Sequence, residues 1–188
     1  HVREKKNRDG TFEPLRKNEN GYRCDSKSRE QESFGRQKRM NRTIRVSAAG
    51  DILIMKRLLP GYQDVLPIRE FLMQGEVRMA NLETTISDGS CYASAYSGGT
   101  WLTADAKCLE DTLRYGFNFL GISNNHTMDY SYEGLASTIS ELKKKDVAYA
   151  GAGKNLYEAS RPAILDTTAG QIAVIDICST FENAARAG

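Results

Sequence analysis

The sequence predicts an α/β domain in which many neighbouring strands are parallel. Three observations predict this fold class. Short β-like runs alternate with segments of helical periodicity from about residue 43 onward. A chain of 188 residues is long enough to bury one sizeable core. Its composition, 40% hydrophobic and 27% charged, is that of a globular protein rather than a disordered or fibrous one.

The first predicted unit runs strand, helix, strand. Residues 43–48 alternate in strand fashion and lead into Gly50-Asp51. Pro60 and Gly61 interrupt the next stretch. Helical spacing then follows, and a second strand over residues 77–80 ends at Asn81-Leu82-Glu83. The apolar residues that set this helical spacing are Val65, Ile68, Phe71 and Leu72.

The middle of the sequence predicts a long loop, a helix and a third strand. Residues 87–100 are rich in Ser, Gly and Tyr, and a loop of this length indicates either a binding role or disorder. Helical spacing resumes at Ala106, Leu109 and Leu113, with Thr103 or Asp105 placed to cap the helix. The strand over residues 117–122 ends at Ser123-Asn124-Asn125-His126.

The last part predicts a helix over residues 132–145, a short strand over 147–150 and a hairpin. The lysines at 143–145 suit the carboxyl end of the helix, where cations interact well with its dipole. Gly151-Ala152-Gly153 is interpreted as a tight turn rather than a phosphate cradle, because no nucleotide-binding pattern follows it. Residues 163–165 and 172–177, on either side of Gly170, are typical of two hairpin strands.

Residues 1–42 differ from the rest, and we interpret them as a basic, polar, flexible leader to a domain over residues 43–188. Residues 1–45 hold 14 Lys and Arg against 7 Asp and Glu, whereas residues 46–188 hold 12 against 17. Basic clusters attract nucleic acids and acidic membranes. Interleaved acidic residues and a near absence of aromatic residues for base stacking argue against nucleic acid.

The cysteine spacing and the lengths of the apolar runs argue against a structural zinc site and against a membrane-spanning helix. Cys24, Cys91, Cys108 and Cys178 form no Cys-x-x-Cys pair and have only two histidines to join them, so free thiols are expected rather than a structural zinc site. No stretch approaches the ~20 apolar residues that a membrane-spanning helix requires. The beginning of the sequence has no apolar signal region.

Polar side chains follow three successive predicted strands, at the points where the strands end. These are Asp51, Glu83 and the Asn125-His126 pair. Sites in α/β sheets form at the carboxyl ends of strands, because the loops there converge on one edge. Carboxylate and amide oxygens favour Mn, Mg or Ca. Taken singly, each residue also fits a simple role as a turn former, surface charge or cap, and Asp129 either orients His126 or, as favoured, caps the next helix.

Three strings resemble the bacterial capsule synthesis family, also called poly-γ-glutamate biosynthesis proteins of the CapA type. The Asn-Asn-His-x-x-Asp-Tyr string after a hydrophobic strand, in the right order after Asn-Leu-Glu, is the most specific of them. Downstream, residues 150–153, 158–159 and Arg161-Pro162 fit the same pattern. The three strings are Ser47-Ala48-Ala49-Gly50-Asp51-Ile52-Leu53, Ala80-Asn81-Leu82-Glu83-Thr84 and Ser123-Asn124-Asn125-His126-Thr127-Met128-Asp129-Tyr130.

The resemblance implies a layered α/β/β/α sandwich similar to that of calcineurin-like metallophosphoesterases. By this likeness Asp51, Glu83 and Asn125 bind a divalent metal, with Mn, Mg, Ca and Zn as candidates. His126 is then catalytic, stabilising charge on a phosphoryl-type oxygen or protonating the leaving group. Asn81, Asn124 and Asp129 are expected to support these residues or contact substrate.

Two departures from the phosphoesterase pattern bear on activity. Leu53 stands where those enzymes carry a His two residues after the first Asp, a change shared by the capsule family. The family's remaining histidine ligands come from segments beyond residue 188, so the sandwich and its metal site are expected to be incomplete at the C-terminal end.

The resemblance leaves two functions open. One is a metal-dependent hydrolase or transferase acting on a phosphoester or an acidic polymer. The other is a non-catalytic capsule-assembly component that holds an anionic polymer or docks a membrane synthase. Members of the family usually work at the outer face of the cell envelope behind an N-terminal anchor, and the sequence from His1 shows no such anchor.

Overall fold

The computed structural model describes residues 43–97 and 99–179, together with the backbone of four short strands nearer the N-terminus. The chain divides into two compact units, His1–Asn41 and Arg42–Gly188. In the first unit β1 pairs with β2, and β3 with β4, both antiparallel. The sequence did not predict these strands, and the flexibility expected of residues 1–42 otherwise falls outside the described residues. The four strands are β1 (Glu4–Lys6), β2 (Phe12–Pro14), β3 (Arg16–Asn18) and β4 (Gly21–Arg23).

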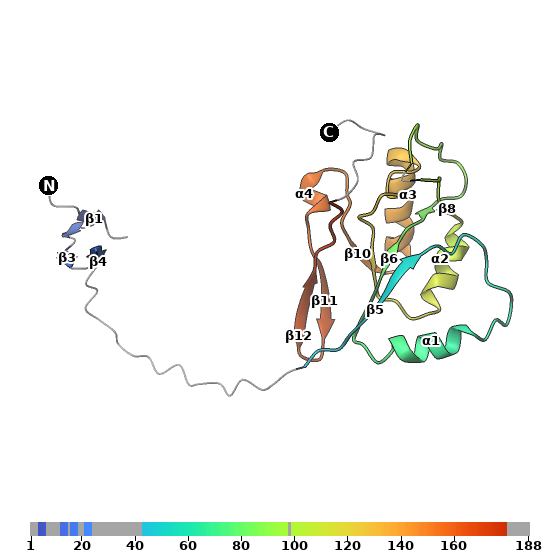
Figure 1. Cartoon of the computed structure of the whole chain (residues 1–188), viewed down its shortest axis with the longest axis horizontal. Helices are drawn as coiled ribbons and strands as arrows, with labels where there is room; N and C mark the ends of the chain where they lie inside the picture. Colours follow the sequence, from blue (N-terminus) through green and yellow to red (C-terminus); the bar gives the residue numbers. More distant parts are fainter. Residues whose placement is uncertain are drawn as a thin grey trace. The chain divides into compact units, whose positions relative to one another are not determined.

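A four-stranded parallel sheet forms the centre of the second unit (Figure 1). Its strand order is β10-β9-β6-β5, and each neighbouring pair is parallel. This confirms the predicted fold class. A separate parallel pair, β7 with β8, brackets the long loop. The strands are β5 (Val46–Ile52), β6 (Val77–Leu82), β7 (Thr85–Ile86), β8 (Thr103–Ala104), β9 (Phe119–Gly121) and β10 (Ala148–Ala150).

In the described part of the second unit, three predicted helices connect these strands, and a fourth, α4, follows β10. Asp105 is the N-cap of α2, as one of the two predicted alternatives had it, and its side chain accepts a hydrogen bond from the backbone of Lys107. The unpredicted α4 is a single turn capped by Asn155. Arg57 fastens the segment before α1 to α2, since its Nε lies 2.6 Å from Oδ2 of Asp111. The helices are α1 (Val65–Leu72), α2 (Ala106–Leu113), α3 (Ser131–Lys144) and α4 (Leu156–Ala159).

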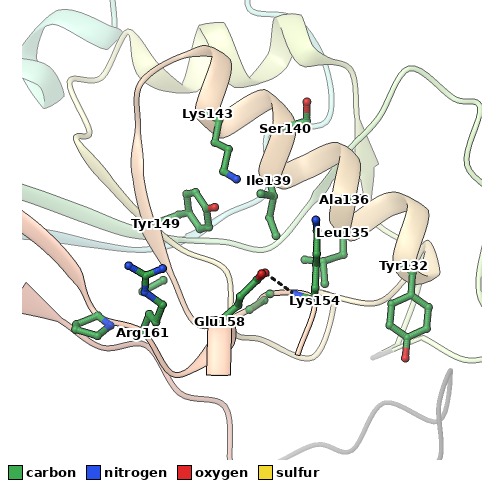
Figure 2. Close-up of a pocket in the computed structure, with 14 residues that line it drawn as sticks. Tyr132, Leu135, Ala136, Ile139, Ser140, Lys143, Tyr149, Lys154, Glu158 and Arg161 are labelled. Atoms are coloured by element: carbon green, nitrogen blue, oxygen red, sulfur yellow. Dashed lines mark hydrogen bonds between the residues drawn. The ribbon is translucent and has the colours of Figure 1, made fainter. Parts of the chain in front are cut away.

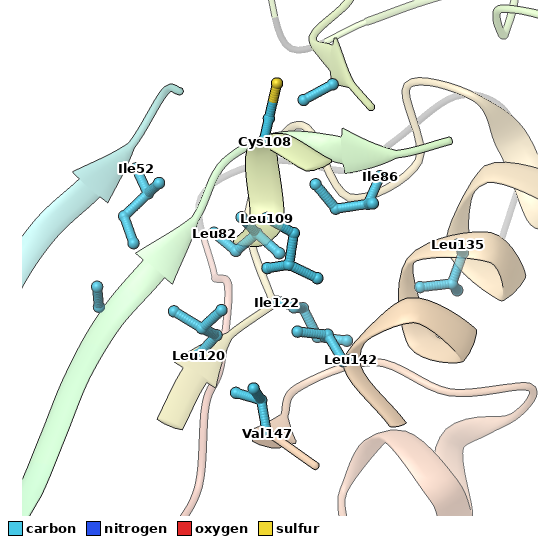
Figure 3. Packing of buried hydrophobic residues seen from close by; sticks show 12 residues of the cluster. Ile52, Leu82, Ile86, Cys108, Leu109, Leu120, Ile122, Leu135, Leu142 and Val147 are labelled. Carbon is cyan, nitrogen blue, oxygen red and sulfur yellow. The ribbon is translucent and has the colours of Figure 1, made fainter. Parts of the chain in front are cut away.

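One face of the sheet packs against α2 and α3 (Figure 3). Successive side chains of a strand point to opposite faces, so alternate residues of β6 and β9 enter this core. Leu109, Leu120 and Leu142 are completely buried within it. Its buried members are Ile52, Ala80, Leu82, Ile86, Ala104, Cys108, Leu109, Leu120, Ile122, Leu135, Leu142 and Val147.

The opposite face carries the predicted hairpin, formed by β11 (Ala163–Thr167) and β12 (Gly170–Val174). Val77 and Phe119, which alternate with the residues of the helical core, pack here with Ala150 and Leu165. Figure 1 shows the hairpin and the helices α2 and α3 on opposite sides of the sheet. The described residues therefore form helices, a parallel sheet and a hairpin in successive layers.

The turn after β10 and the cysteines agree with the sequence interpretation. The chain bends at Gly151, which adopts a φ of 103°, a conformation that L side chains rarely adopt, as expected of a glycine where the chain changes direction. A Cβ on Gly153 would lie 2.5 Å from Cβ of Glu158, so this glycine permits close packing of the turn against α4. Cys91, Cys108 and Cys178, the cysteines in the described part of the chain, are free thiols.

Candidate functional site

The three strands that end in the predicted site residues are neighbours in the sheet. Asp51 of β5 lies opposite Asn81 of β6, and Asn81 lies opposite Gly121 of β9. An irregularity in the β5–β6 register between Ala48 and Asp51 brings Asp51 to this position. Because the strands are parallel, their carboxyl ends meet at one edge, as the sequence predicted.

Asn81 joins the two predicted carboxylate ligands. Its Nδ2 donates to Oδ1 of Asp51 and to Oε1 of Glu83, at 2.8 Å in each case. Its Oδ1 accepts a hydrogen bond of 2.9 Å from Nδ2 of Asn124. One oxygen of each carboxylate is therefore held by the same amide, which fixes Asp51 and Glu83 around a common point.

Asn124 fastens the turn after β9 to strand β6. In addition to Asn81, its Nδ2 donates to the carbonyl oxygen of Leu82 at 2.9 Å. Its Oδ1 accepts from the backbone N–H of His126 at 3.0 Å. A single amide side chain thus satisfies backbone groups of both segments, and it places His126 beside the end of β6.

His126 is buried and held from one side by Asp129. Its Nδ1 lies 2.8 Å from Oδ2 of Asp129, and that oxygen also accepts from the backbone N–H of Leu102 at 2.7 Å. Since a carboxylate oxygen accepts hydrogen bonds, Nδ1 carries the proton of this contact. The N-cap of α3 is Tyr130 and makes no side-chain cap hydrogen bond. Of the two predicted roles of Asp129, the structure shows the orientation of His126 and not the favoured helix cap.

Glu83 lies on the other side of the histidine ring. Oε2 of Glu83 is 3.7 Å from Nε2 of His126, and both residues are buried, with exposed fractions of 9% and 8%. Burial raises the pKa of Glu83, and the nearby charge of Asp51 raises it further, whereas His126 and the hydrogen bond from Asn81 lower it. Two acidic groups therefore contact opposite nitrogens of one imidazole.

Asn125, the third predicted metal ligand, is half-buried on the same turn between Asn124 and His126. All seven predicted site residues thus lie on the ends of β5 and β6 or on the turn after β9. Within residues 43–97 and 99–179, the His, Cys, Asp and Glu side chains form no group of three suited to a metal ion. The metal-binding and catalytic roles given to these residues stay predictions.

Asp176, two residues after β12, is a site residue that the sequence interpretation missed. Its Oδ2 accepts from the backbone N–H of Ser123 at 2.7 Å, directly before the Asn124–His126 turn. Burial raises its pKa, while hydrogen bonds from backbone amides, that of Ser123 first, lower it. The feature of the sequence that could have revealed it is a single carboxylate within the otherwise apolar run 172–177. Gly121 and Gly151, at the ends of β9 and β10, leave it room.

The family model of the bacterial capsule synthesis protein PGA_cap matches residues 45–188. The chain belongs to this capsule synthesis family. The match begins at the first strand of the sheet and includes each of the residues Asp51, Glu83, Asn125 and His126. The family that the motifs resembled is therefore confirmed.

Curated relatives of this capsule synthesis family protein include an uncharacterized protein, y4sH, of Sinorhizobium fredii. It is 29% identical over 147 residues, which cover 74% of this chain and 31% of that protein. The capsule biosynthesis protein CapA of Bacillus anthracis is 24% identical over 151 residues, or 76% of this chain and 36% of that protein. The chain spans about a third of the length of these relatives.

Among the described residues, none of the helices combines the length and the apolar character needed to cross a bilayer.

Proposed function

We propose that the strand-end site carries out metal-assisted hydrolysis or group transfer on a phosphoester or an amide-linked acidic polymer. The observation that carries this proposal is the setting of His126. Its Nδ1 is held by a buried carboxylate, and its Nε2 faces a second carboxylate 3.7 Å away. A buried histidine oriented in this way is suited to general acid–base chemistry.

In the proposed reaction, each group has a distinct task. Asp129 keeps the proton on Nδ1, so that Nε2 is the nitrogen that exchanges a proton with substrate. The carboxylates of Asp51 and Glu83, with the amide of Asn125, are the oxygen donors for a divalent cation. When bound, such a cation supplies a hydroxide nucleophile and polarises the reacting oxygen. Asn81 and Asn124 keep the carboxylates and the histidine turn in register.

The chemistry of the donors, two carboxylates and one amide, suits a hard divalent cation as part of a coordination shell. Asn81 engages one oxygen of each carboxylate, so Oδ2 of Asp51 and Oε2 of Glu83 would be the oxygens that bind the cation. We further propose that the whole domain is a metallophosphatase-like sandwich. The parallel sheet with helices on one face and a strand hairpin on the other supports this architecture.

The test combines metal binding with turnover. The protein is titrated with Mn²⁺ and assayed on a generic phosphodiester and on poly-γ-glutamate. Replacing His126 by Ala is expected to lower turnover by about 100-fold or more while metal binding persists, because it removes a proton-transfer group. Asp51→Asn is expected to weaken binding of Mn²⁺, because it removes a charged oxygen ligand. Glu110→Gln, a change at an exposed carboxylate outside the site, is the matched control. Absence of both metal and turnover in a full-length protein would refute the proposal.

A non-catalytic capsule-assembly component is the second candidate, and two observations favour it. Leu53 occupies the position where phosphoesterases of this type carry a histidine, and its side chain is 53% exposed. The Nδ2 of Asn81 also lies between Asp51 and Glu83, where a shared cation would be held. This component would bind an anionic polymer or a membrane synthase. Polymer binding that survives His126→Ala and removal of metal would support it, and loss of binding in either case would favour the enzyme.

A further inference from the structure

Asp176 lies at the same edge of the sheet as the strand-end site, and two glycines make room for its carboxylate. Gly121 is the last residue of β9, and Gly151 directly follows β10. A Cβ added at Gly151 would lie 2.4 Å from Cβ of Ser123 and 2.7 Å from Oδ2 of Asp176. The atoms nearest to a Cβ added at Gly121 also belong to this carboxylate. A side chain at either position would therefore have to displace it.

The turn after β10, which begins with Gly151, is held at its far end by α4. The backbone N–H of Lys154 donates to Oε2 of Glu158 at 3.0 Å, the dashed line in Figure 2. The carboxylate of Asp176 therefore packs against a turn that is itself fixed. The same turn borders a hollow of about 690 Å³ beside α3. The cations that line this hollow are Lys143, Lys154 and Arg161.

The segment after β12 holds Ser123 at two points. Oδ2 of Asp176 accepts from the backbone N–H of Ser123 at 2.7 Å, and Oγ of Ser123 accepts from the backbone N–H of Cys178 at 2.9 Å. Ser123 directly precedes Asn124-Asn125-His126, the histidine turn. Two hydrogen bonds from a distant part of the sequence thus fix the residue at which this turn begins.

A displacement of Ser123 would be passed on to His126, because the residues between and around them are interlocked. Oγ1 of Thr127 accepts from the backbone N–H of Asn124 at 2.9 Å and donates to the carbonyl oxygen of Ile122 at 2.7 Å. Oδ1 of Asn124 accepts from the backbone N–H of His126 at 3.0 Å. These local hydrogen bonds make the turn one unit, so the imidazole moves with its beginning.

We propose that Asp176 is a positioning residue for His126. It holds the beginning of the histidine turn through Ser123, while Asp129 holds the ring at the other end of the turn. Proton transfer requires the ring nitrogen to lie within hydrogen-bond reach of the reacting group, so a small shift of the turn lowers the rate. The effect on turnover rests on the function proposed above, whereas the effect on the ring does not.

The first test observes the ring of His126 directly, in the full chain. The sequence has two histidines, His1 and His126, so isotope-labelled histidine gives few ring signals, and His126→Gln identifies those of His126. The proton on Nδ1, which contacts Asp129, is followed by its exchange with solvent at one fixed pH. Asp176→Ala is expected to raise this exchange rate by about tenfold, because the turn opens more easily without the contact to Ser123.

Glu76→Ala is the matched control. Oε2 of Glu76 accepts from the backbone N–H of Thr168 at 2.6 Å, so this change also removes a carboxylate that holds the hairpin layer, but at the amino end of β6. It is expected to leave the exchange of the His126 ring proton unchanged. Asp176→Asn keeps an acceptor oxygen for Ser123 and is expected to restore the exchange rate to within about twofold of wild type.

Turnover of the generic phosphodiester or of poly-γ-glutamate gives the second readout. Asp176→Ala is expected to lower kcat by about tenfold with little change in KM, because it displaces the reacting group and not the bound substrate. Glu76→Ala is expected to change neither constant.

Three results would overturn the proposal. These are equal exchange of the ring proton in wild type and Asp176→Ala, an equal increase of exchange in Glu76→Ala, and an unchanged kcat of Asp176→Ala in a protein that turns over substrate. Failure of the proposed function is a different result. In that case the wild-type protein shows no turnover, yet Asp176→Ala still speeds exchange at the ring of His126, and the positioning role stands.

Discussion

The contact between Asp176 and the end of β9 predicts a specific reversal in stability. Oδ2 of Asp176 accepts from the backbone of Ser123 at 2.7 Å, and Gly121 leaves space beneath this carboxylate. A Cβ added at Gly121 would lie 2.8 Å from Oδ2 and 3.0 Å from Cγ of Asp176, its nearest neighbours. The backbone of Gly121 is not in the left-handed region, and the three atoms nearest to an added Cβ all belong to the carboxylate of Asp176.

The magnitudes follow from these contacts. Gly121→Ala is expected to lower the free energy of unfolding by about 1–3 kcal/mol through overpacking. Asp176→Ala is expected to lower it by about 1–2 kcal/mol, because the partly buried N–H of Ser123 loses its acceptor. In the Asp176→Ala background, Gly121→Ala no longer meets the carboxylate. It is expected there to stabilise by about 0.4–1 kcal/mol, because alanine restricts the unfolded chain.

The assay is urea unfolding of the four proteins, followed by far-UV circular dichroism and by the fluorescence of Trp101, the single tryptophan. The predicted sign change of Gly121→Ala between the two backgrounds is the decisive observation. Additive effects, within about 0.5 kcal/mol, would show that Gly121 and Asp176 do not interact and would refute the reasoning.

Three further predictions concern charge and packing. Asp111→Asn is expected to cost about 1–2 kcal/mol at pH 7, because the carboxylate accepts from Arg57 and from the backbone of Leu58. Arg57 lowers the pKa of Asp111, so the cost of Asp111→Asn should disappear as the pH falls below the usual Asp range. Urea unfolding at a series of pH values measures this, and a cost that does not change with pH would contradict the prediction. Burial raises the pKa of Glu83, so the ionised carboxylate destabilises the folded protein at neutral pH. In the presence of a chelator, Glu83→Gln is therefore expected to raise the free energy of unfolding at neutral pH. The gain should disappear at acidic pH, where the wild-type carboxyl is also neutral. Leu142→Ala, at a side chain with 0% exposure, is expected to cost about 2–5 kcal/mol by thermal and urea unfolding, whereas Leu156→Ala, at a side chain 83% exposed, should stay within about 0.5 kcal/mol.

The sequence was informative where local patterns decide the structure. The parallel strands, the three longer helices and the hairpin around Gly170 all follow from hydrophobic period and turn residues. The convergence of Asp51, Glu83 and His126 followed from one topological rule, that parallel strands end at the same edge of a sheet. Local spacing also left two candidates for the cap of α2, and the structure selected Asp105.

The parts that escaped prediction depend on contacts between distant residues. Asp176 lies 53 residues from Ser123, and no local pattern links the two. The role of Asp129 depended on whether its side chain turned toward His126 or toward α3, which spacing leaves undecided. The hollow beside α3 required knowledge that Lys143, Lys154 and Arg161 face the same space. The short α4 has only four residues, too few for a helical period to be recognised.

The long loop over residues 87–100 was expected either to bind or to be disordered, and the structure ties it to the histidine turn. The backbone N–H of Ser94 donates to the carbonyl oxygen of Asp129 at 2.8 Å, and Nε1 of Trp101 donates to the carbonyl oxygen of Ser94 at 2.9 Å. Oδ2 of Asp129 receives the N–H of Leu102 as well as the ring of His126. Asp129 therefore contacts both the loop and the imidazole, and its contact with Nδ1 orients the ring. A displacement of Ser94 would also disturb the residue that orients the ring of His126, so the loop and the histidine turn depend on the same contacts.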